Sequence, residues 1–263
     1  MMSLPPVVPP LPRPRPLARG LPPAAALDWL GAGWRDLMQA PGPSLVYGLL
    51  VFLLSLAITL LMVGLGLDYV MFPALAGFLV CAPTLALGLY EKSRLIETGQ
   101  RVSLARMVWP APASGRAHLL FTGLLLCGLM LLWMRAAVIL YALFFGLHPF
   151  PGLDHIAPML FSTGTGLAML VVGSLVGGLF AAFSFAISAF SIPMLLERRS
   201  DALTAMGMSW ALVWNNLPVM LVWGAIVLAL FLLSLATGLL GLIVTFPWLG
   251  HATWHAWRAV RPE

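Results

Sequence analysis

The chain of 263 residues is 61% hydrophobic and only 9% charged, whereas soluble domains carry about 25% charged residues. Apolar runs without charge recur along it, and each is long enough to supply the roughly 20 residues that cross a bilayer core. This pattern excludes a soluble enzyme domain. The net charge of +5 comes from Lys and Arg at the ends of apolar runs, where they set topology. We therefore expect an all-α integral membrane protein with no nucleic-acid partner.

Residues 1–23 contain nine prolines. Such a segment favours an extended, solvated conformation that cannot bury a core. We predict a disordered cytoplasmic tail, with a ligand for a proline-binding module as the alternative reading. Residues 24–263 then form one transmembrane domain.

The transmembrane domain begins with a short amphipathic helix at 28–40, which Asp28 caps and two prolines end. Its apolar face and its tryptophan place it in the headgroup plane. Transmembrane helices are expected at 44–66, 69–91, 117–146, 165–196, 217–237 and 242–259, with an amphipathic piece at 103–109 and an interfacial helix at 201–215. Glu91, Lys92 and Arg94 are interpreted as the point where the second span leaves the membrane.

One spacing recurs three times along the chain. Each of three tryptophans is followed 14 positions later by a glycine, in the pairs Trp34 and Gly48, Trp109 and Gly123, and Trp210 and Gly224. A repeated spacing of this kind indicates a repeated supersecondary unit. We predict six transmembrane helices in three pseudo-repeats, each led by a short interfacial helix on the cytoplasmic side.

The distribution of basic residues decides the expected orientation. The chain has 14 Lys and Arg residues, and all except Arg135 fall on one side of the six predicted spans. Cytoplasmic segments carry the excess of Lys and Arg in membrane proteins. Both termini and all three interfacial helices are therefore expected on the cytoplasmic side.

Several passages in the second half resemble a known family. They are Ile192-Pro193-Met-Leu-Leu-Glu197, then Asp201, Ala205 and Ser209, then Asn215-Asn216-Leu-Pro218, and the ending Gly250-His-Ala-Thr-Trp-His255. They are similar to the bacterial integral membrane proteins grouped as domain of unknown function 2189. The resemblance extends over nearly all the chain after the proline-rich tail. It implies a bacterial inner-membrane protein and no established activity.

His251 and His255 are four positions apart and so face one side of one helix, a spacing used in metal ligation. Two ligands do not complete a site, so we predict no cofactor. We expect the pair to hydrogen-bond to backbone groups or to Asn215 and Asn216, with metal or haem ligation as the alternative. A second alternative metal site gathers His148, Asp154 and His155 on the outer face.

Arg135 is the one basic residue inside a predicted span, and a charge there is costly unless it is paired or reaches the interface. Asp68 and Asp154 are its candidate partners. An ion pair or a snorkelling side chain is the expected role, and contact with a substrate or lipid headgroup is the alternative.

Small residues line the fourth span at Gly173, Gly177 and Gly178, where they let helices approach closely. They indicate close packing of helices within the bundle, with self-association or contact with a partner subunit as the alternative. Cys81 and Cys127 fall inside predicted spans, and no disulfide is expected between them.

No nucleophile motif, catalytic carboxylate pair or phosphate-binding loop is recognisable in the sequence. We therefore expect a structural or accessory membrane protein, such as an assembly factor or small subunit, rather than an enzyme. It would contact the lipid bilayer and a membrane-complex partner or further copies of itself. The alternatives are a transporter or lipid-handling protein, and a haem- or metal-binding protein that uses His251 and His255.

Overall fold

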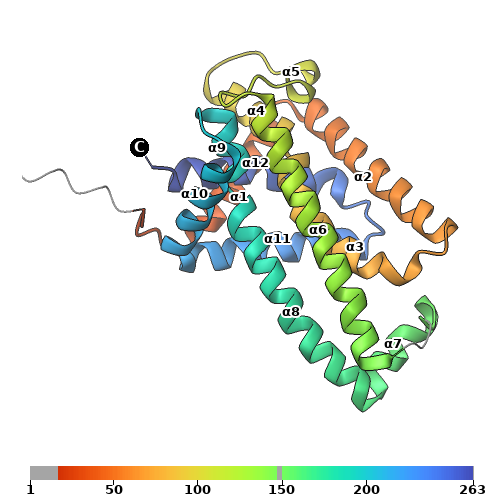
Figure 1. The fold of residues 1–263 in the computed structure, drawn as a ribbon. Coiled ribbons are helices and arrows are strands. Elements are labelled where there is room, and N and C mark those ends of the chain that lie inside the picture. The colour runs from red at the N-terminus through yellow and green to blue at the C-terminus, as the bar shows by residue number, and fades with distance from the viewer. Residues whose placement is uncertain (1–16, 147–149, 263) are drawn as a thin grey trace, which may run out of the picture.

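The computed structural model describes residues 17–146 and 150–262, and within these residues the secondary structure is helical, without strands (Figure 1). The long helices are α2 (Pro41–Gly64), α3 (Met71–Leu85), α6 (Arg116–Phe145), α8 (Gly164–Ser188), α11 (Leu217–Ala236) and α12 (Leu242–Val260). The shorter elements are α1 (Ala25–Met38), η1 (Asp68–Val70), α4 (Leu87–Glu97), α5 (Leu104–Val108), α7 (Leu153–Ser162), α9 (Ser191–Glu197) and α10 (Ala202–Asn215). The predicted tail lies largely outside the described residues.

Five helices of the described part are long and apolar enough to cross a membrane. They are Pro41–Gly64, Met71–Glu97, Arg116–Phe145, Gly164–Glu197 and Leu217–Ala236. The predicted sixth span, α12, is not among them. Its sequence includes His251, His255 and Arg258, which lower its hydropathy, and most of its other side chains are buried between neighbouring helices.

Most of the short helices lie at one end of the bundle. Figure 1 shows α4, α5, α9, α10 and the C-terminus at one end, with α7 and the turn after α2 at the other. Helices α6 and α8 extend beyond the rest of the bundle and are joined through α7. Their outward surfaces carry exposed apolar side chains such as Leu124, Leu143 and Leu179, as a lipid-facing surface requires.

Two of the long apolar segments are broken near the end that carries the short helices. The first break separates α3 from α4 at Ala86, and the Tyr47 hydroxyl donates to the carbonyl of Leu85 there. The second separates α8 from α9, and Ser209 accepts from the Phe190 amide and donates to the Ala186 carbonyl. Side chains of neighbouring helices thus satisfy backbone groups at both breaks, which a membrane environment demands.

Helix α12 lies at the centre of the packing and contacts α1, α2, α4 and α11. Trp254 and Trp257 are fully buried on it, and their indole nitrogens donate to Glu97 and Glu197. Arg258 pairs with both of these carboxylates. The ends of α4, α9 and α12 are therefore tied together by one ion-pair network.

The three glycines of the repeated spacing lie at helix contacts. A side chain at Gly48 would collide with the backbone carbonyl of Ile243 on α12. A Cβ atom at Gly123 would lie 3.1 Å from Thr84 Cγ2 on α3, and one at Gly224 would lie 3.8 Å from Phe185 Cζ on α8. The paired tryptophans Trp34, Trp109 and Trp210 are exposed. Each glycine is thus near the start of a long helix that meets a helix from another part of the chain.

Candidate functional site

The most polar part of the interior surrounds His251, which is fully buried. Its Nε2 is 2.9 Å from Ser44 Oγ on α2, and its Nδ1 is 2.9 Å from Ser93 Oγ on α4. The Lys92 ammonium is also fully buried and donates to Ser44 Oγ at 2.7 Å and to the Ala40 carbonyl at 2.8 Å. Side chains of α2 and α4 therefore meet His251 of α12, and Lys92 ties the α1–α2 connection to the same group.

The chemistry of these groups assigns the direction of each hydrogen bond. Lys92 only donates, so Ser44 accepts from it. On the other side of the ring, Ser93 gives its one proton to the Asp36 carboxylate and therefore accepts from Nδ1 of His251. Nδ1 then holds the ring proton of a neutral imidazole. Nε2 of the neutral ring is then the acceptor of the Ser44 proton. Ser44, His251 and Ser93 thus form a continuous series of hydrogen bonds from Lys92 to Asp36.

The far end of this series is the pair formed by Asp36 and His255, whose Oδ2 and Nε2 atoms are 2.9 Å apart. Burial by itself raises the pKa of the Asp36 carboxyl, but the hydrogen bonds from His255 and Ser93 outweigh it and hold the pKa below its usual value. Asp36 is therefore an ionised carboxylate near neutral pH. We call these six residues, Asp36, Ser44, Lys92, Ser93, His251 and His255, the polar network.

The polar network corrects two interpretations drawn from the sequence. Lys92 and Glu91 are not in contact with water as that interpretation implied, because both are buried in the packing around α4. The histidines bond to serines and Asp36, whereas Asn216 bonds to the backbone of Leu17 and Leu212. The i, i+4 spacing identified the two histidines, but no feature of the sequence identified their partners, which come from distant helices.

Both ring nitrogens of His251 are engaged by serines in this arrangement. Among the residues that the structure describes, no group of three or more His, Cys, Asp or Glu side chains is arranged to hold a metal ion. Ligation of a metal or haem by His251 and His255 stays a prediction. What the geometry provides is a hydrogen-bonded connection between a buried ammonium and a buried carboxylate.

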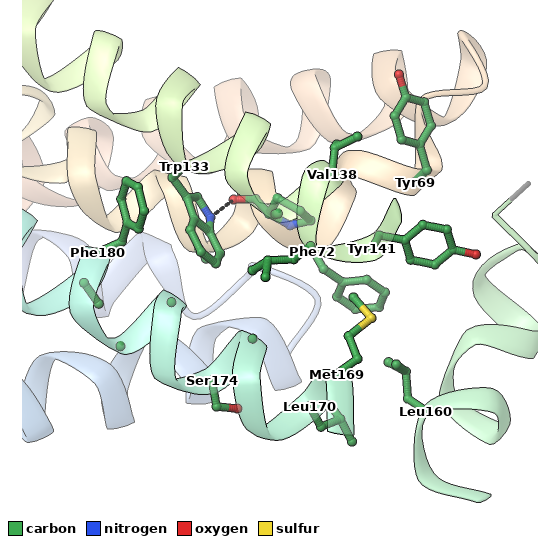
Figure 2. Close-up of a pocket in the computed structure, with 18 of the residues that line it drawn as sticks. Tyr69, Phe72, Trp133, Val138, Tyr141, Leu160, Met169, Leu170, Ser174 and Phe180 are labelled. Atoms are coloured by element: carbon green, nitrogen blue, oxygen red, sulfur yellow. Dashed lines mark hydrogen bonds between the residues drawn. The ribbon is translucent and has the colours of Figure 1, made fainter. Parts of the chain in front are cut away.

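A second feature is a partly open cavity of about 820 Å³ between α3, α6 and α8, to which α7 contributes Ile156 and Leu160. Its lining is apolar except for three hydroxyl-bearing side chains, Tyr69, Tyr141 and Ser174, and includes no charged residue. Figure 2 shows Trp133 and Phe180 at one end and Tyr69 and Tyr141 at the other. The cavity volume lies in the range of roughly 300–1,000 Å³ that is typical of small-molecule sites.

The small residues of α8 create this cavity. Gly173, Gly177 and Gly178 all line it. A Cβ atom at Gly177 would lie 3.0 Å from the Trp133 ring, whereas one at Gly173 or Gly178 would have no atom within 4 Å. The Trp133 indole donates to the Pro73 carbonyl at 3.0 Å, which fixes the ring against α3. Two of the three glycines therefore leave open space instead of a helix contact.

The structure describes only some of the charged and histidine side chains that the sequence places toward the outer side of the membrane. Arg135 is exposed on α6. The side chains of Asp68 and Asp154 lie outside the described part of the structure, so an ion pair with Arg135 stays a prediction. His155 is exposed on α7, and His148 falls within the undescribed residues 147–149. The outer metal site built from these residues is therefore also still a prediction.

The resemblance to a known family is confirmed over part of the chain. Residues 71–197 match the family model described as predicted integral membrane protein (DUF2189). The matched range begins at α3 and ends with α9, so it is narrower than expected and does not include the Gly250–His255 ending. No curated protein and no solved structure matches the chain.

Proposed function

We propose that this integral membrane protein binds a lipid, with an acyl chain held in the cavity between α3, α6 and α8. The observation that carries the proposal is an uncharged cavity of about 820 Å³ built within candidate membrane spans. It agrees with the lipid-handling alternative from the sequence. The accessory role stays a prediction alongside it.

The two ends of the cavity differ in a way that suits an amphipathic ligand. Trp133 and Phe180 pack at a centroid distance of 5.5 Å and form an apolar inner end. Tyr69 and Tyr141 supply hydroxyl groups at the end nearest η1 and α7 (Figure 2). Tyrosine favours the level of the lipid headgroups because one end of its ring is apolar and the other polar. An acyl chain would fill the inner end, and the glycerol and ester groups would lie beside the tyrosines.

The proposal includes six spans, with α12 as the sixth, in a bacterial inner membrane. The basic segments are expected on one side of the membrane. In support of this, one end of the bundle carries α4, α5, α9, α10 and the C-terminus (Figure 1). Because cytoplasmic segments of membrane proteins carry the excess of Lys and Arg, we place that end, together with both termini, on the cytoplasmic side. The cavity then lies toward the opposite, outer side.

Three repeated units are also part of the proposal: α1–α4, α5–α9 and α10–α12. The contacts of the repeated glycines support it, because they follow a cyclic order. Gly48 of the first unit meets α12 of the third, Gly123 of the second meets α3 of the first, and Gly224 of the third meets α8 of the second. The short helices follow the same order, with α1 on α12, α5 on α4, and α10 on α8.

Filling the cavity tests the proposed function. Gly178→Leu adds a side chain where no atom lies within 4 Å, so it occupies the cavity without a backbone collision. We expect the variant to retain at least tenfold less lipid than the unchanged protein. The measurement is native mass spectrometry of the full chain purified from bacterial membranes in mild detergent, followed by analysis of the extracted lipid.

The matched control is Gly128→Leu on α6, because Gly128 is exposed, does not line the cavity and also has no atom within 4 Å. We expect it to retain lipid like the unchanged protein. Equal lipid retention by folded Gly178→Leu would refute the acyl-chain site. A co-purifying subunit or a second copy seated in the cavity would refute it too, and would support the accessory role.

Labelling of single cysteines tests the topology. His155→Cys places a thiol on exposed α7, and Arg199→Cys places one after α9, both in a Cys81→Ser, Cys127→Ser background. We expect a membrane-impermeant maleimide to label position 155 in intact spheroplasts and position 199 only after lysis. Labelling of both positions, or the reverse pattern, would contradict cytoplasmic termini.

A further inference from the structure

Three sulfur atoms meet between α3 and α6, in a part of the protein that the lipid cavity does not use. Cys81 Sγ on α3 lies 3.8 Å from Cys127 Sγ and 3.7 Å from Met130 Sδ, both on α6. Both cysteines are free. Cys127 and Met130 are three residues apart and so lie on one face of their helix.

The neighbourhood of Gly77 explains how a methionine reaches this position. A Cβ atom at Gly77 would lie 2.6 Å from Met130 Cγ and 3.3 Å from its sulfur. Only the absence of a side chain at Gly77 gives Met130 room against α3. The thioether is therefore placed beside Cys81 by the close contact of the two helices.

We propose that Cys81, Cys127 and Met130 bind a Cu(I) ion with three sulfur ligands. A metal bonded to three sulfurs at about 2.3 Å in a trigonal plane holds them about 4.0 Å apart. The two separations that the structure gives from Cys81 Sγ, 3.8 Å to Cys127 Sγ and 3.7 Å to Met130 Sδ, are close to this value. Cys81 Sγ therefore has both of its partners near the spacing that such a site requires.

The ligand set selects the metal. Thiolate and thioether sulfurs are soft donors, which favour Cu(I) over harder divalent ions. Structural zinc sites use four ligands and do not use thioethers. In the described residues no group of three His, Cys, Asp or Glu side chains offers a competing site.

The charge balance also favours a monovalent ion at this depth. Cu(I) displaces the proton of one thiol, which leaves to solvent, and the resulting thiolate cancels the single positive charge of the metal. The second thiol and the thioether donate lone pairs as neutral ligands. The complex then carries no net charge, so it avoids the cost of an uncompensated charge inside the membrane. Cys127 is exposed on the outer surface of α6, so the site lies at the edge of the helix packing and not in its interior.

The test is a Cu(I) titration of the full chain, reduced and in detergent, against the chromophoric chelator bicinchoninate. We expect one Cu(I) per chain. Cys81→Ser and Cys127→Ser should each weaken binding at least a hundredfold, and Met130→Leu about tenfold. Met134→Leu is the control, because Met134 is one turn further along α6 and should leave the affinity unchanged. X-ray absorption should show a shell of sulfur atoms only, at about 2.3 Å.

Two results would overturn the proposal. One is unchanged Cu(I) affinity in the folded Cys81→Ser, Cys127→Ser double variant. The other is failure of the protein without substitutions to take Cu(I) from the chelator. That result overturns the proposal even if mild oxidation joins Cys81 and Cys127 in a disulfide. Neither result depends on lipid retention, so this inference and the proposed function fail separately.

Discussion

Replacing Gly48 by alanine should lower the free energy of unfolding by about 3 kcal/mol, the upper end of the usual cost of overpacking. A methyl group at Gly48 would collide with the backbone carbonyl of Ile243, and a backbone cannot rotate away as a side chain can. Helices α2 and α12 would have to separate along their contact. The measurement is unfolding of the purified chain in mixed micelles with increasing denaturing detergent.

The control for Gly48→Ala is Gly128→Ala. Gly128 is also a helical glycine in a long apolar helix, but it has no atom within 4 Å of its Cβ position. Alanine is favoured over glycine inside a helix by up to about 1 kcal/mol, so this variant should be as stable as the unchanged protein or more stable. Equal stability of the two variants would show that α2 and α12 are not in close contact at Gly48.

Lys92→Met should destabilise the fold by about 3–5 kcal/mol, as removal of one member of a buried charge network does. The substitution leaves the Ala40 carbonyl and Ser44 without their donor, inside packing that excludes water. It also leaves the Asp36 carboxylate without the positive charge at the other end of the polar network. The same unfolding measurement applies, with Arg101→Met as the control, because Arg101 is exposed and its loss should matter by less than about 0.5 kcal/mol.

A double-mutant cycle tests whether the polar network acts as one unit. Asp36 and Lys92 interact through Ser44, His251 and Ser93 instead of by direct contact. If the connection transmits their interaction, Asp36→Asn and Lys92→Met should be coupled by about 1 kcal/mol or more. Additive effects would mean that the serines and His251 satisfy their neighbours locally and do not connect the two charges.

The long apolar helices could be predicted from the sequence with little error. Composition and run length located five of the six expected spans, because a run of apolar residues in a helix needs no partner to be stable in a membrane. The helix breaks near Ala86 and Phe190 were not predicted. They depend on Tyr47 and Ser209, which come from other helices and supply the missing hydrogen bonds.

The candidate sites were harder to predict. The small residues of α8 were interpreted as a packing surface, and only the tertiary structure shows that Gly173 and Gly178 line a cavity and have no atom within 4 Å of their Cβ positions. Cys81 and Cys127 were expected to be small buried side chains, but Cys127 is exposed, and their approach to 3.8 Å requires the contact of α3 with α6. Spacing along one helix carries no information about such contacts.

By itself, the sequence determined that this is an α-helical integral membrane protein and where most of its spans lie. The physical reason is that burial in lipid depends on the local run of apolar residues and on backbone hydrogen bonds within a single helix. The tertiary structure alone decided that Lys92 is buried, that His251 links it toward Asp36, and that a cavity opens beside Trp133. Each of these features joins residues from helices far apart in the chain, and only the packing of those helices brings them together.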